Sequence, residues 1–523
     1  MLNTVKDPHC ASVSKVFGGL VVLILTLAMT SCDAGAPAAP ASPGLDRFYG
    51  QQIAWEPCES YATTSIESAV YAGTPTAACG RLEVPLKYQD PEGRTARLAV
   101  MRVPARGDAI GSLVINPGGP GGSGLFGAAA TALGLAQGRL TERFDLVGWD
   151  PRGVGKSEPA IECFTDADAD RGDFLLSTQG TTVQWTEQDT KDVLDRCAAR
   201  SGGVDVLTSV GTRDAARDID VLRAALGDQK LTFLGQSYGT RLGSVYAEQF
   251  PQHVRAMLLD GAIDPNQGTV ARRVSAYAGF QRSFEQLAAF CATQADCPLG
   301  NDPARATEVF HEIVRPLYGR AVPALNYDLD FDEAIGGVIS GLYTEAAWPR
   351  IIAGIAQLQQ GRGDELLQLG YDFSLRDAEG RWTNFAEALY AINCMDEERL
   401  SVQDGNALRD AIFEAAPFMD PGVGLAGARD GCEHWPAEPT LGFPYAADIE
   451  ALPPTLVVSI TGDPTTPHAG AVNLAETLGS ALLTVEGEGH TIVTAGTNSC
   501  VNEIAADYLI DLTLPHKAVS CAL

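Results

Sequence analysis

Apolar residues recur along most of the chain in two alternating patterns. Short continuous apolar runs at 111–116, 144–149 and 231–234 are typical of strands buried in a parallel sheet. Before the third run, residues 212–227 place apolar side chains on one helical face and end on a glycine suited to a C-cap. Strands that alternate with helices predict an α/β protein, with a mostly parallel sheet, right-handed crossovers and helices on both faces.

Two parts of the chain depart from this alternation. Residues 81–91 and 96–105 alternate apolar and polar positions, which predicts two antiparallel edge strands. From about 266 to 443 the pattern becomes helical, as in 283–294 and 348–361, with little strand signal. The strand pattern resumes at 455–467, so the helical block is an insertion that is too long to be a plain loop.

The N-terminal segment has the composition of an export signal. Lys6 and Lys15 precede the apolar stretch 16–29, which is short for a membrane span and predicts a secretory signal. Small residues lead directly into Cys32, as in a bacterial lipoprotein cleavage site, and this favours a lipid anchor on Cys32. Ordinary secretion, with cleavage in the alanine-rich stretch that follows, is the alternative.

The chain is long enough, at 523 residues, for one large α/β domain with an insertion or for two domains. We expect the following order: signal peptide 1–31, flexible Pro/Ala-rich tether 32–50, first part of the core 51–265, helical insertion 266–443, and C-terminal part of the core 444–523.

Cysteine usage also favours export. Of 12 cysteines, Cys10 lies in the signal and Cys32 is the proposed anchor, which leaves 12 − 2 = 10. An even number of well-separated cysteines in an exported chain predicts disulfides, although the sequence does not determine their pairing. Metal binding is disfavoured because no CxxC pair or His/Cys cluster has ligand spacing. The ten residues are neighbours in the order Cys58 and Cys79, Cys163 and Cys197, Cys291 and Cys297, Cys394 and Cys432, and Cys500 and Cys521.

Net charge excludes one class of partner. The formal charge of −29 would repel a polyphosphate, so we expect no nucleic acid, and no phosphate-binding loop or cofactor motif is present. The excess of acidic residues implies solubility and weakly favours a cationic end on the substrate.

The candidate chemistry begins at Ser237, which lies in the sequence GQSYG directly after an apolar run. A Gly-x-Ser-x-Gly pattern between a strand and a helix is typical of a sharp turn that exposes a nucleophilic serine. Glycines at 235 and 239 allow the close backbone approach that such a turn needs. A serine hydroxyl also needs a base, a group that orients the base, and donors for the oxyanion.

His490 is the best candidate for the base because it follows a buried strand in the glycine-rich turn EGEGH. Asp463 follows the preceding core strand and is the candidate acid, with Asp260 and Asp264 as rivals that also end a core strand. The order Ser237, Asp463, His490 is that of the α/β-hydrolases. Loss of activity is expected as the pH falls and His490 becomes protonated. The other histidines are less suitably placed: His9, His253, His311, His434, His468 and His516.

Oxyanion donors are expected from two places. The N–H of Tyr238 follows the nucleophile, and the glycine-rich loop 116–124 follows an earlier strand. Because Pro117 and Pro120 have no N–H, the second donor is Gly118 or Gly119.

Six motifs, in this order, resemble the actinobacterial tripeptidyl and prolyl aminopeptidase branch of the α/β-hydrolases: NPGGPGGSG, DPRGVGKSEP, GQSYGTRLG, LDGAIDP, AINCMDEE and TGDPTTPHAGA. That branch includes mycobacterial cell-envelope serine hydrolases described as proteases or carboxylesterases. The resemblance covers about Trp55 to Cys521 and departs from the family at Lys156, where an arginine is expected.

The resemblance implies an α/β-hydrolase fold with a large helical insertion, and the triad Ser237, Asp463 and His490. It also implies an oxyanion donor at Gly119. In the family, acidic residues of the insertion receive the substrate's α-amino group, and Asp396 and Glu397 are the nearest matches. A solvated helix cap beside a cysteine bridge is the alternative for Asp396.

Three functions follow as hypotheses. The first is an exported, lipid-anchored serine peptidase of the cell envelope, expected to be monomeric, which releases short N-terminal peptides through an acyl-enzyme on Ser237. The second is an esterase or lipase that uses the same triad on acyl esters. The third is a non-catalytic surface binding protein on a hydrolase scaffold.

Overall fold

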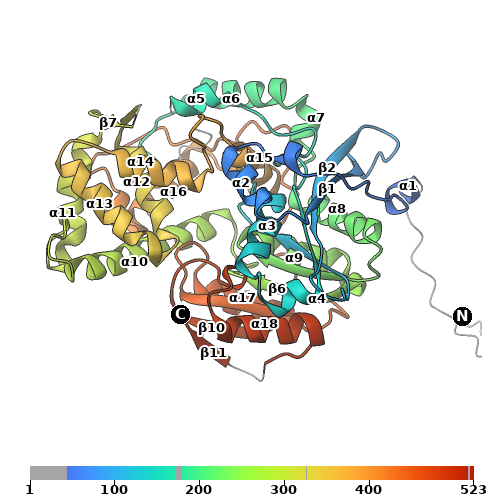
Figure 1. Ribbon diagram of the computed structural model, residues 1–523. Helices are drawn as coiled ribbons and strands as arrows, with labels where there is room; N and C mark the ends of the chain where they lie inside the picture. The colour runs from blue at the N-terminus through green and yellow to red at the C-terminus, as the bar shows by residue number, and fades with distance from the viewer. Residues whose placement is uncertain (1–43, 172–179, 326, 516–518) are drawn as a thin grey trace, which may run out of the picture. The chain divides into compact units, whose positions relative to one another are not determined.

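Nine strands of the described residues form one sheet in the order β1-β2-β4-β3-β5-β6-β9-β10-β11 (Figure 1). The structure is a computed structural model and describes residues 44–171, 180–325, 327–515 and 519–523. The strands of this sheet are β1 (Ala78–Pro85), β2 (Thr95–Val103), β3 (Ser112–Asn116), β4 (Asp145–Trp149), β5 (Leu231–Gln236), β6 (Val254–Asp260), β9 (Leu456–Gly462), β10 (Ala481–Glu488) and β11 (Val519–Ala522).

The sheet is parallel from β4 to β11, and only the β1–β2 and β2–β4 pairs are antiparallel. The predicted antiparallel pair is therefore confirmed. Its position was partly wrong, because β2 lies between β1 and β4 and only β1 is at the edge. The opposite edge strand β11 was not predicted.

Helices cover both faces of the sheet, as the alternating pattern predicted. Along β9, Val457 faces one hydrophobic core while Leu456 and Val458 face the other, because successive strand side chains point to opposite faces. The first core includes apolar side chains of α8 (Thr212–Ala225), α9 (Tyr238–Gln249) and α17 (His468–Leu478). The second includes those of α3 (Gly124–Gly134) and α18 (Ser499–Asp511).

Further helices precede β5 in the chain. They are α1 (Asp46–Tyr49), α2 (Ser65–Ala72), α4 (Arg139–Arg143), α5 (Asp166–Asp170), α6 (Glu187–Arg200) and α7 (Val204–Leu207).

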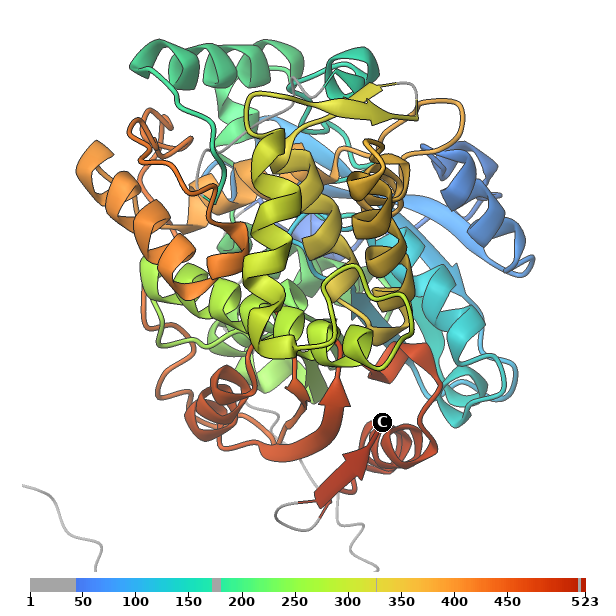
Figure 2. The same ribbon diagram turned by 90° about the vertical axis from the view of Figure 1, so that its left-hand side faces the viewer.

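The regular secondary structure between β6 and β9 is mostly helical. Most of its helices gather beside the sheet domain, which Figure 1 shows from the side and Figure 2 from the front. Their own hydrophobic core includes Phe284, Phe310, Val338 and Ile355. The helices are α10 (Thr269–Ala292), α11 (Ala306–Val314), α12 (Phe331–Leu342), α13 (Trp348–Gln359), α14 (Asp364–Phe373), α15 (Phe385–Asp396) and α16 (Val402–Ala415).

A short antiparallel hairpin, β7 (Val322–Ala324) and β8 (Tyr327–Leu329), interrupts this helical insertion and was not predicted. Residues 43–523 form one compact unit, so the expected domain limits at 266 and 443 stay a prediction.

The end of the expected tether belongs to the fold. Phe48 of α1 is 1% exposed and packs in the core on the α8 face of the sheet, so a flexible segment reaching residue 50 was wrong at this end. The signal segment and Cys32 lie outside the described residues. Among the residues that are described, no helix is long and apolar enough to cross a membrane.

Five disulfides occur within the described residues, and each joins cysteines that are neighbours in the sequence. The pairs are Cys58–Cys79, Cys163–Cys197, Cys291–Cys297, Cys394–Cys432 and Cys500–Cys521.

Candidate active site

Ser237 occupies a strained turn between β5 and α9. Its backbone has φ 54° and ψ −122°, a conformation that costs a non-glycine residue free energy and is concentrated at functional sites. Glycine is required on both sides of this turn because a side chain would clash with neighbouring backbone. A Cβ on Gly235 would lie 2.3 Å from the carbonyl oxygen of Gly239. A Cβ on Gly239 would lie 2.7 Å from the carbonyl oxygen of Asn116. The turn predicted from GQSYG is present.

Asp463 and His490 follow the carboxyl ends of β9 and β10, which are parallel to β5. Functional loops of such sheets gather at this edge. The two side chains form a hydrogen bond of 2.8 Å between Asp463 Oδ2 and His490 Nδ1. Asp463 is 1% exposed, and its other oxygen accepts the N–H groups of Thr465 at 3.0 Å and Thr466 at 2.8 Å. This pairing leaves Nε2 of His490 as the ring nitrogen for proton transfer.

Two further groups hold this pair. The hydroxyl of Thr466 donates to Asp463 Oδ2 at 2.9 Å and lies 3.3 Å from His490 Nδ1. The carbonyl oxygen of Tyr343, at the end of α12, accepts the main-chain N–H of His490 at 3.0 Å. Neither role was predicted from the sequence. Thr466 is part of the motif TGDPTTPHAGA, but nothing in the local sequence links Tyr343 to His490.

The rival acids have other partners. Oδ2 of Asp260 accepts the N–H groups of Ile492 and Val493 at 2.8 and 2.9 Å, so this carboxylate holds the loop that follows His490. Burial raises the pKa of Asp260 to about 6, although those N–H donors oppose the rise. Asp264 accepts hydrogen bonds from the N–H of Asn266 and the side chain of Asn473.

The other described histidines occupy other places in the fold. His253 pairs with Asp220, His311 hydrogen-bonds the carbonyl oxygen of Pro417, and His434 is near Glu187 and Glu433. His468 begins α17.

The glycine-rich loop after β3 reaches the nucleophile. A Cβ on Gly118 would lie 2.9 Å from the Cβ of Ser237 and 3.1 Å from the N atom of Tyr238. The N–H of Gly118 already donates to Asn116 Oδ1 at 3.1 Å, which favours Gly119 over Gly118 as the oxyanion donor. Gly119 and Tyr238 both line the same cavity.

That cavity has a volume of about 1060 Å³ and lies between the sheet edge and the helical insertion. Tyr343 and Thr465 line it beside the Asp463–His490 pair, and Phe280 and Leu366 give it apolar surface. A cavity of this size, lined by apolar and by charged side chains, has room for a substrate of several residues.

One wall of the cavity is acidic. Asp330, Asp332 and Glu333 line it at the N-terminus of α12. Burial, reinforced by the neighbouring aspartates, raises the pKa of Glu333 to about 7. Burial also raises the pKa of Asp332, against the hydrogen bonds that Thr182 donates to it. A cationic ligand would stabilise both carboxylates in their charged form.

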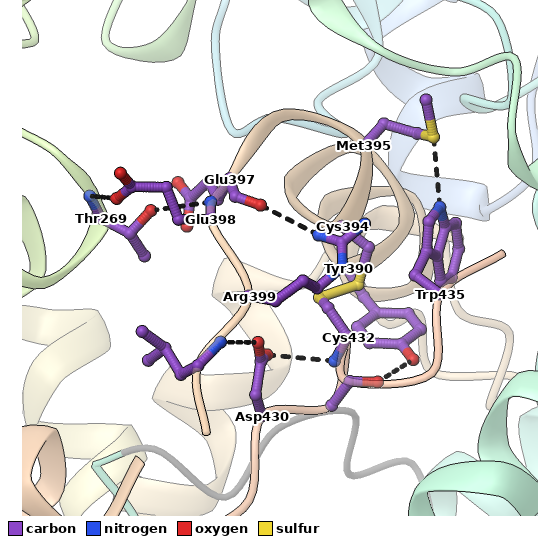
Figure 3. The surroundings of a disulfide bond; sticks show 12 residues. Thr269, Tyr390, Cys394, Met395, Glu397, Glu398, Arg399, Asp430, Cys432 and Trp435 are labelled. Carbon is purple, nitrogen blue, oxygen red and sulfur yellow. Dashed lines mark hydrogen bonds between the residues drawn. A yellow bond between two sulfur atoms is a disulfide. The ribbon is translucent and has the colours of Figure 1, made fainter. Parts of the chain in front are cut away.

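Asp396 and Glu397, the residues matched to amino-group binding, lie at the end of α15 (Figure 3 shows the surroundings of Glu397). The Cys394–Cys432 bridge and the hydrogen bonds of Tyr390 and Trp435 fix this helix end. Both carboxylates are fully buried, and neither lines the cavity.

Each of these carboxylates already has a partner in the protein. Asp396 accepts hydrogen bonds from the N–H of Thr212, at 2.9 Å, and from its hydroxyl. Glu397 pairs with Arg272 and Arg273. Burial favours the neutral acid, but the guanidinium groups of Arg272, Arg273 and Arg241 lower the pKa of Glu397 to about 2. The role in amino-group binding therefore stays a prediction.

A mostly parallel sheet, a serine on a strained strand-to-helix turn, and a buried Asp–His pair at the same sheet edge define a hydrolase of the α/β class. Residues 111–495 match the family described as the alpha/beta hydrolase fold. The chain belongs to this family.

Relatives of known name share almost the whole chain. It is 42% identical over 518 residues to serine protease Hip1 of Mycobacterium tuberculosis, covering 97% of each chain. It is 38% identical to carboxylesterase B of the same organism, covering 98% of this chain and 97% of the relative. Tripeptidyl aminopeptidase of Streptomyces coelicolor is 32% identical, with 85% of this chain and 83% of the relative covered. The chain is thus a serine hydrolase.

Proposed function

We propose that this chain is a peptidase that releases short peptides from the N-termini of peptides or proteins, through an acyl-enzyme on Ser237. The observation that carries the proposal is the strained Ser237 turn at the same sheet edge as the 2.8 Å Asp463–His490 hydrogen bond. The relatives named as a protease and as a tripeptidyl aminopeptidase favour peptide substrates.

In the mechanism, His490 Nε2 accepts the proton of the Ser237 hydroxyl while Oγ attacks the substrate carbonyl carbon. Asp463 orients the imidazole through Nδ1 and stabilises the positive charge that develops on it. The N–H groups of Gly119 and Tyr238 donate to the oxyanion. His490 then gives its proton to the leaving amine, and a water molecule activated in the same way releases the peptide from Ser237.

Restriction to N-termini needs a group that binds the substrate ammonium. We matched Asp396 and Glu397 to this role, but neither of them lines the cavity. Asp332 and Glu333 line the cavity and are better placed to receive a cation. An ammonium in this acidic wall would fix the distance from the N-terminus to the bond that is cleaved.

Covalent labelling tests the nucleophile. A fluorophosphonate should label the protein stoichiometrically, and Ser237→Ala should abolish the labelling while the circular dichroism spectrum is unchanged. A folded wild-type protein that is not labelled would contradict the proposal.

Esterase activity is the second candidate, and two observations favour it. Carboxylesterase B is similar over almost the full chain, and part of the cavity wall is apolar. A panel of tripeptide amides and short acyl esters separates the two functions by kcat/KM, since both reactions use the same triad. Faster turnover of every ester than of any tripeptide amide, with free and acetylated N-termini treated alike, would favour the esterase.

We also propose that the protein is exported and attached to the cell membrane through a lipid on Cys32, and that it is a monomer. The apolar segment 16–29 and the small residues before Cys32 support the anchor. Partition of the wild type into a detergent phase, and of Cys32→Ser into the aqueous phase, tests it. Sedimentation of the detergent-free Cys32→Ser protein tests the oligomeric state.

A further inference from the structure

Three arginines line the cavity that reaches the two proposed oxyanion donors. Arg241 lies on α9, one helical turn after Ser237, and Arg272 and Arg273 lie on the first turns of α10. All three line the same cavity as Gly119 and Tyr238. None of the three takes part in the proposed proton transfers or in oxyanion binding.

Their positive charge exceeds the negative charge that faces them. Glu397 receives all three guanidinium groups: Arg273 Nη2 at 2.8 Å, Arg241 Nη1 at 3.5 Å, and Arg272 Nη2. Asp396 lies 4.0 Å from Arg241. Within the described part of the chain, all ion pairs of these arginines go to Asp396 or Glu397. Three cations therefore face two carboxylates, and Asp396 also receives the Thr212 hydroxyl.

Several donors of this cluster lack an acceptor. Among the described residues, Nε and Nη2 of Arg241 and Nε of Arg272 are buried and have no hydrogen-bond partner. The side chain of Arg241 is only 2% exposed. The buried hydroxyl of Tyr445 also faces Arg241 and interacts with its guanidinium group. Unpaired donors of this kind are costly in a protein interior, so an acceptor that reached them would stabilise this cluster.

We propose that Arg241 and Arg272 form a carboxylate subsite of the cavity, and that the enzyme prefers peptide substrates with a carboxylate close to the scissile bond. A guanidinium fork matches a carboxylate with two parallel N–H donors. Asp332 and Glu333, which line the same cavity, would repel a polyanion, whereas a peptide with an ammonium at one end and a carboxylate at the other complements both charged groups. The identity of the substrate as a peptide rests on the proposed function.

The carboxylate has two possible sources, which matched substrates separate. An acidic side chain is tested by tripeptidyl p-nitroanilides that end in glutamate or in glutamine. A free C-terminus is tested by tetra-alanine as the acid or as its C-terminal amide. In the wild type we expect kcat/KM of the acid member of at least one pair to exceed that of the neutral member about 10-fold.

Arg272→Gln should remove most of this preference, and Arg272→Lys should restore part of it because a lysine keeps the charge but loses the fork. Arg305→Gln, which removes an exposed arginine of the same helical insertion, is the matched control and should keep the preference. Circular dichroism spectra of the variants verify that each is folded.

A binding measurement separates this inference from the peptidase proposal. Succinate, but not its diamide, should raise the Tm of the Ser237→Ala protein at constant ionic strength, and Arg272→Gln should abolish the rise. If peptides are not cleaved but succinate raises the Tm in this way, the carboxylate subsite stands and the peptidase fails. Cleavage of both members of each pair at equal kcat/KM would overturn the subsite and leave the peptidase intact, as would a Tm that succinate does not change.

Discussion

The main-chain N–H of His490 donates to the carbonyl oxygen of Tyr343 at 3.0 Å, and the Tyr343 ring meets the imidazole edge-on at a centroid distance of 5.4 Å. His490 belongs to the sheet domain and Tyr343 to the helical insertion. The insertion therefore does more than cover the cavity, because it positions the proposed catalytic base. A displacement of α12 would move the backbone of His490 directly.

Tyr343→Ala should lower kcat by roughly 2- to 10-fold, because an aromatic contact of this geometry contributes about 0.5–1.5 kcal/mol and its loss frees the imidazole. KM should change less for a small ester that does not reach the α12 wall. Tyr343→Phe is the matched control, since it keeps the ring and removes only the hydroxyl that interacts with Thr465. Steady-state kinetics on p-nitrophenyl butyrate measure both, and equal losses in the two variants would assign the effect to the hydroxyl.

Asp463→Asn should lower kcat by about 10³–10⁴-fold, because an amide no longer favours the imidazole tautomer that has its proton on Nδ1. The new side chain still offers one oxygen to the N–H groups of Thr465 and Thr466, so the fold should be retained. Single-turnover kinetics and the Tm provide the two measurements. Asp264→Asn removes the rival carboxylate and should leave kcat within a few-fold of the wild type.

How much of this site the sequence predicts depends on how local each signal is. The Ser237 turn is encoded within five residues, since glycines at 235 and 239 permit the close approach that the structure shows. The positions of Asp463 and His490 follow from strand ends, which parallel-sheet topology brings to one edge. These predictions needed no knowledge of the tertiary packing.

The contacts of the helical insertion could not be predicted in this way. The bond between Tyr343 and His490 joins residues far apart in the chain, and no hydrophobic pattern specifies it. The same holds for Glu397, which the resemblance matched to amino-group binding. Its pairing with Arg272 and Arg273 depends on how α10 packs against the end of α15.

Gly239→Ala should prevent accumulation of folded protein, because its Cβ would lie 2.7 and 2.9 Å from the two oxygens of Asn116. To relieve this clash, the β3 loop and the Ser237 turn would have to separate. That separation would lower the free energy of unfolding by about 1–3 kcal/mol or more. Gly424→Ala is the control, since a Cβ there meets nothing within 4 Å. Soluble yield and Tm distinguish the two, and a well-folded, active Gly239→Ala protein would contradict the turn geometry.

Glu333→Gln should raise KM for a tripeptide amide with a free N-terminus about 10-fold, because it removes a carboxylate from the cavity wall that we propose binds the ammonium. KM for the N-acetylated peptide should be unchanged, since that substrate has no positive charge. The glutamine can still accept the N–H of Asp330, so the start of α12 is preserved.

Asp396→Asn tests the alternative that Asp396, and not Glu333, binds the substrate ammonium. Its carboxylate accepts from Thr212 and does not line the cavity, so we expect loss of stability without a selective loss of the free-amine substrate. If KM for the free-amine substrate rises selectively in Asp396→Asn and not in Glu333→Gln, the ammonium binds at the end of α15 and not at α12.

Asp260 should make the protein less stable as the pH rises from about 4 to about 6. Burial raises its pKa from 3.8 to about 6, so in this interval the folded state binds more protons than the unfolded state. Its contribution to the free energy of unfolding is therefore most favourable below pH 4, falls through this window, and is lower by about 2–3 kcal/mol above it.

Asp260→Asn should remove this dependence. The amide oxygen can accept the N–H groups of Ile492 and Val493, and the NH₂ group replaces the buried oxygen Oδ1, which has no partner among the described residues. Urea unfolding of the wild type and of Asp260→Asn from pH 4 to 7 isolates the contribution of Asp260 to the free energy of unfolding, because the other carboxylates contribute equally in the two proteins. The variant should gain stability relative to the wild type as the pH rises through this window. A difference that does not change with pH would mean that Asp260 ionises in the folded protein as readily as in the unfolded chain.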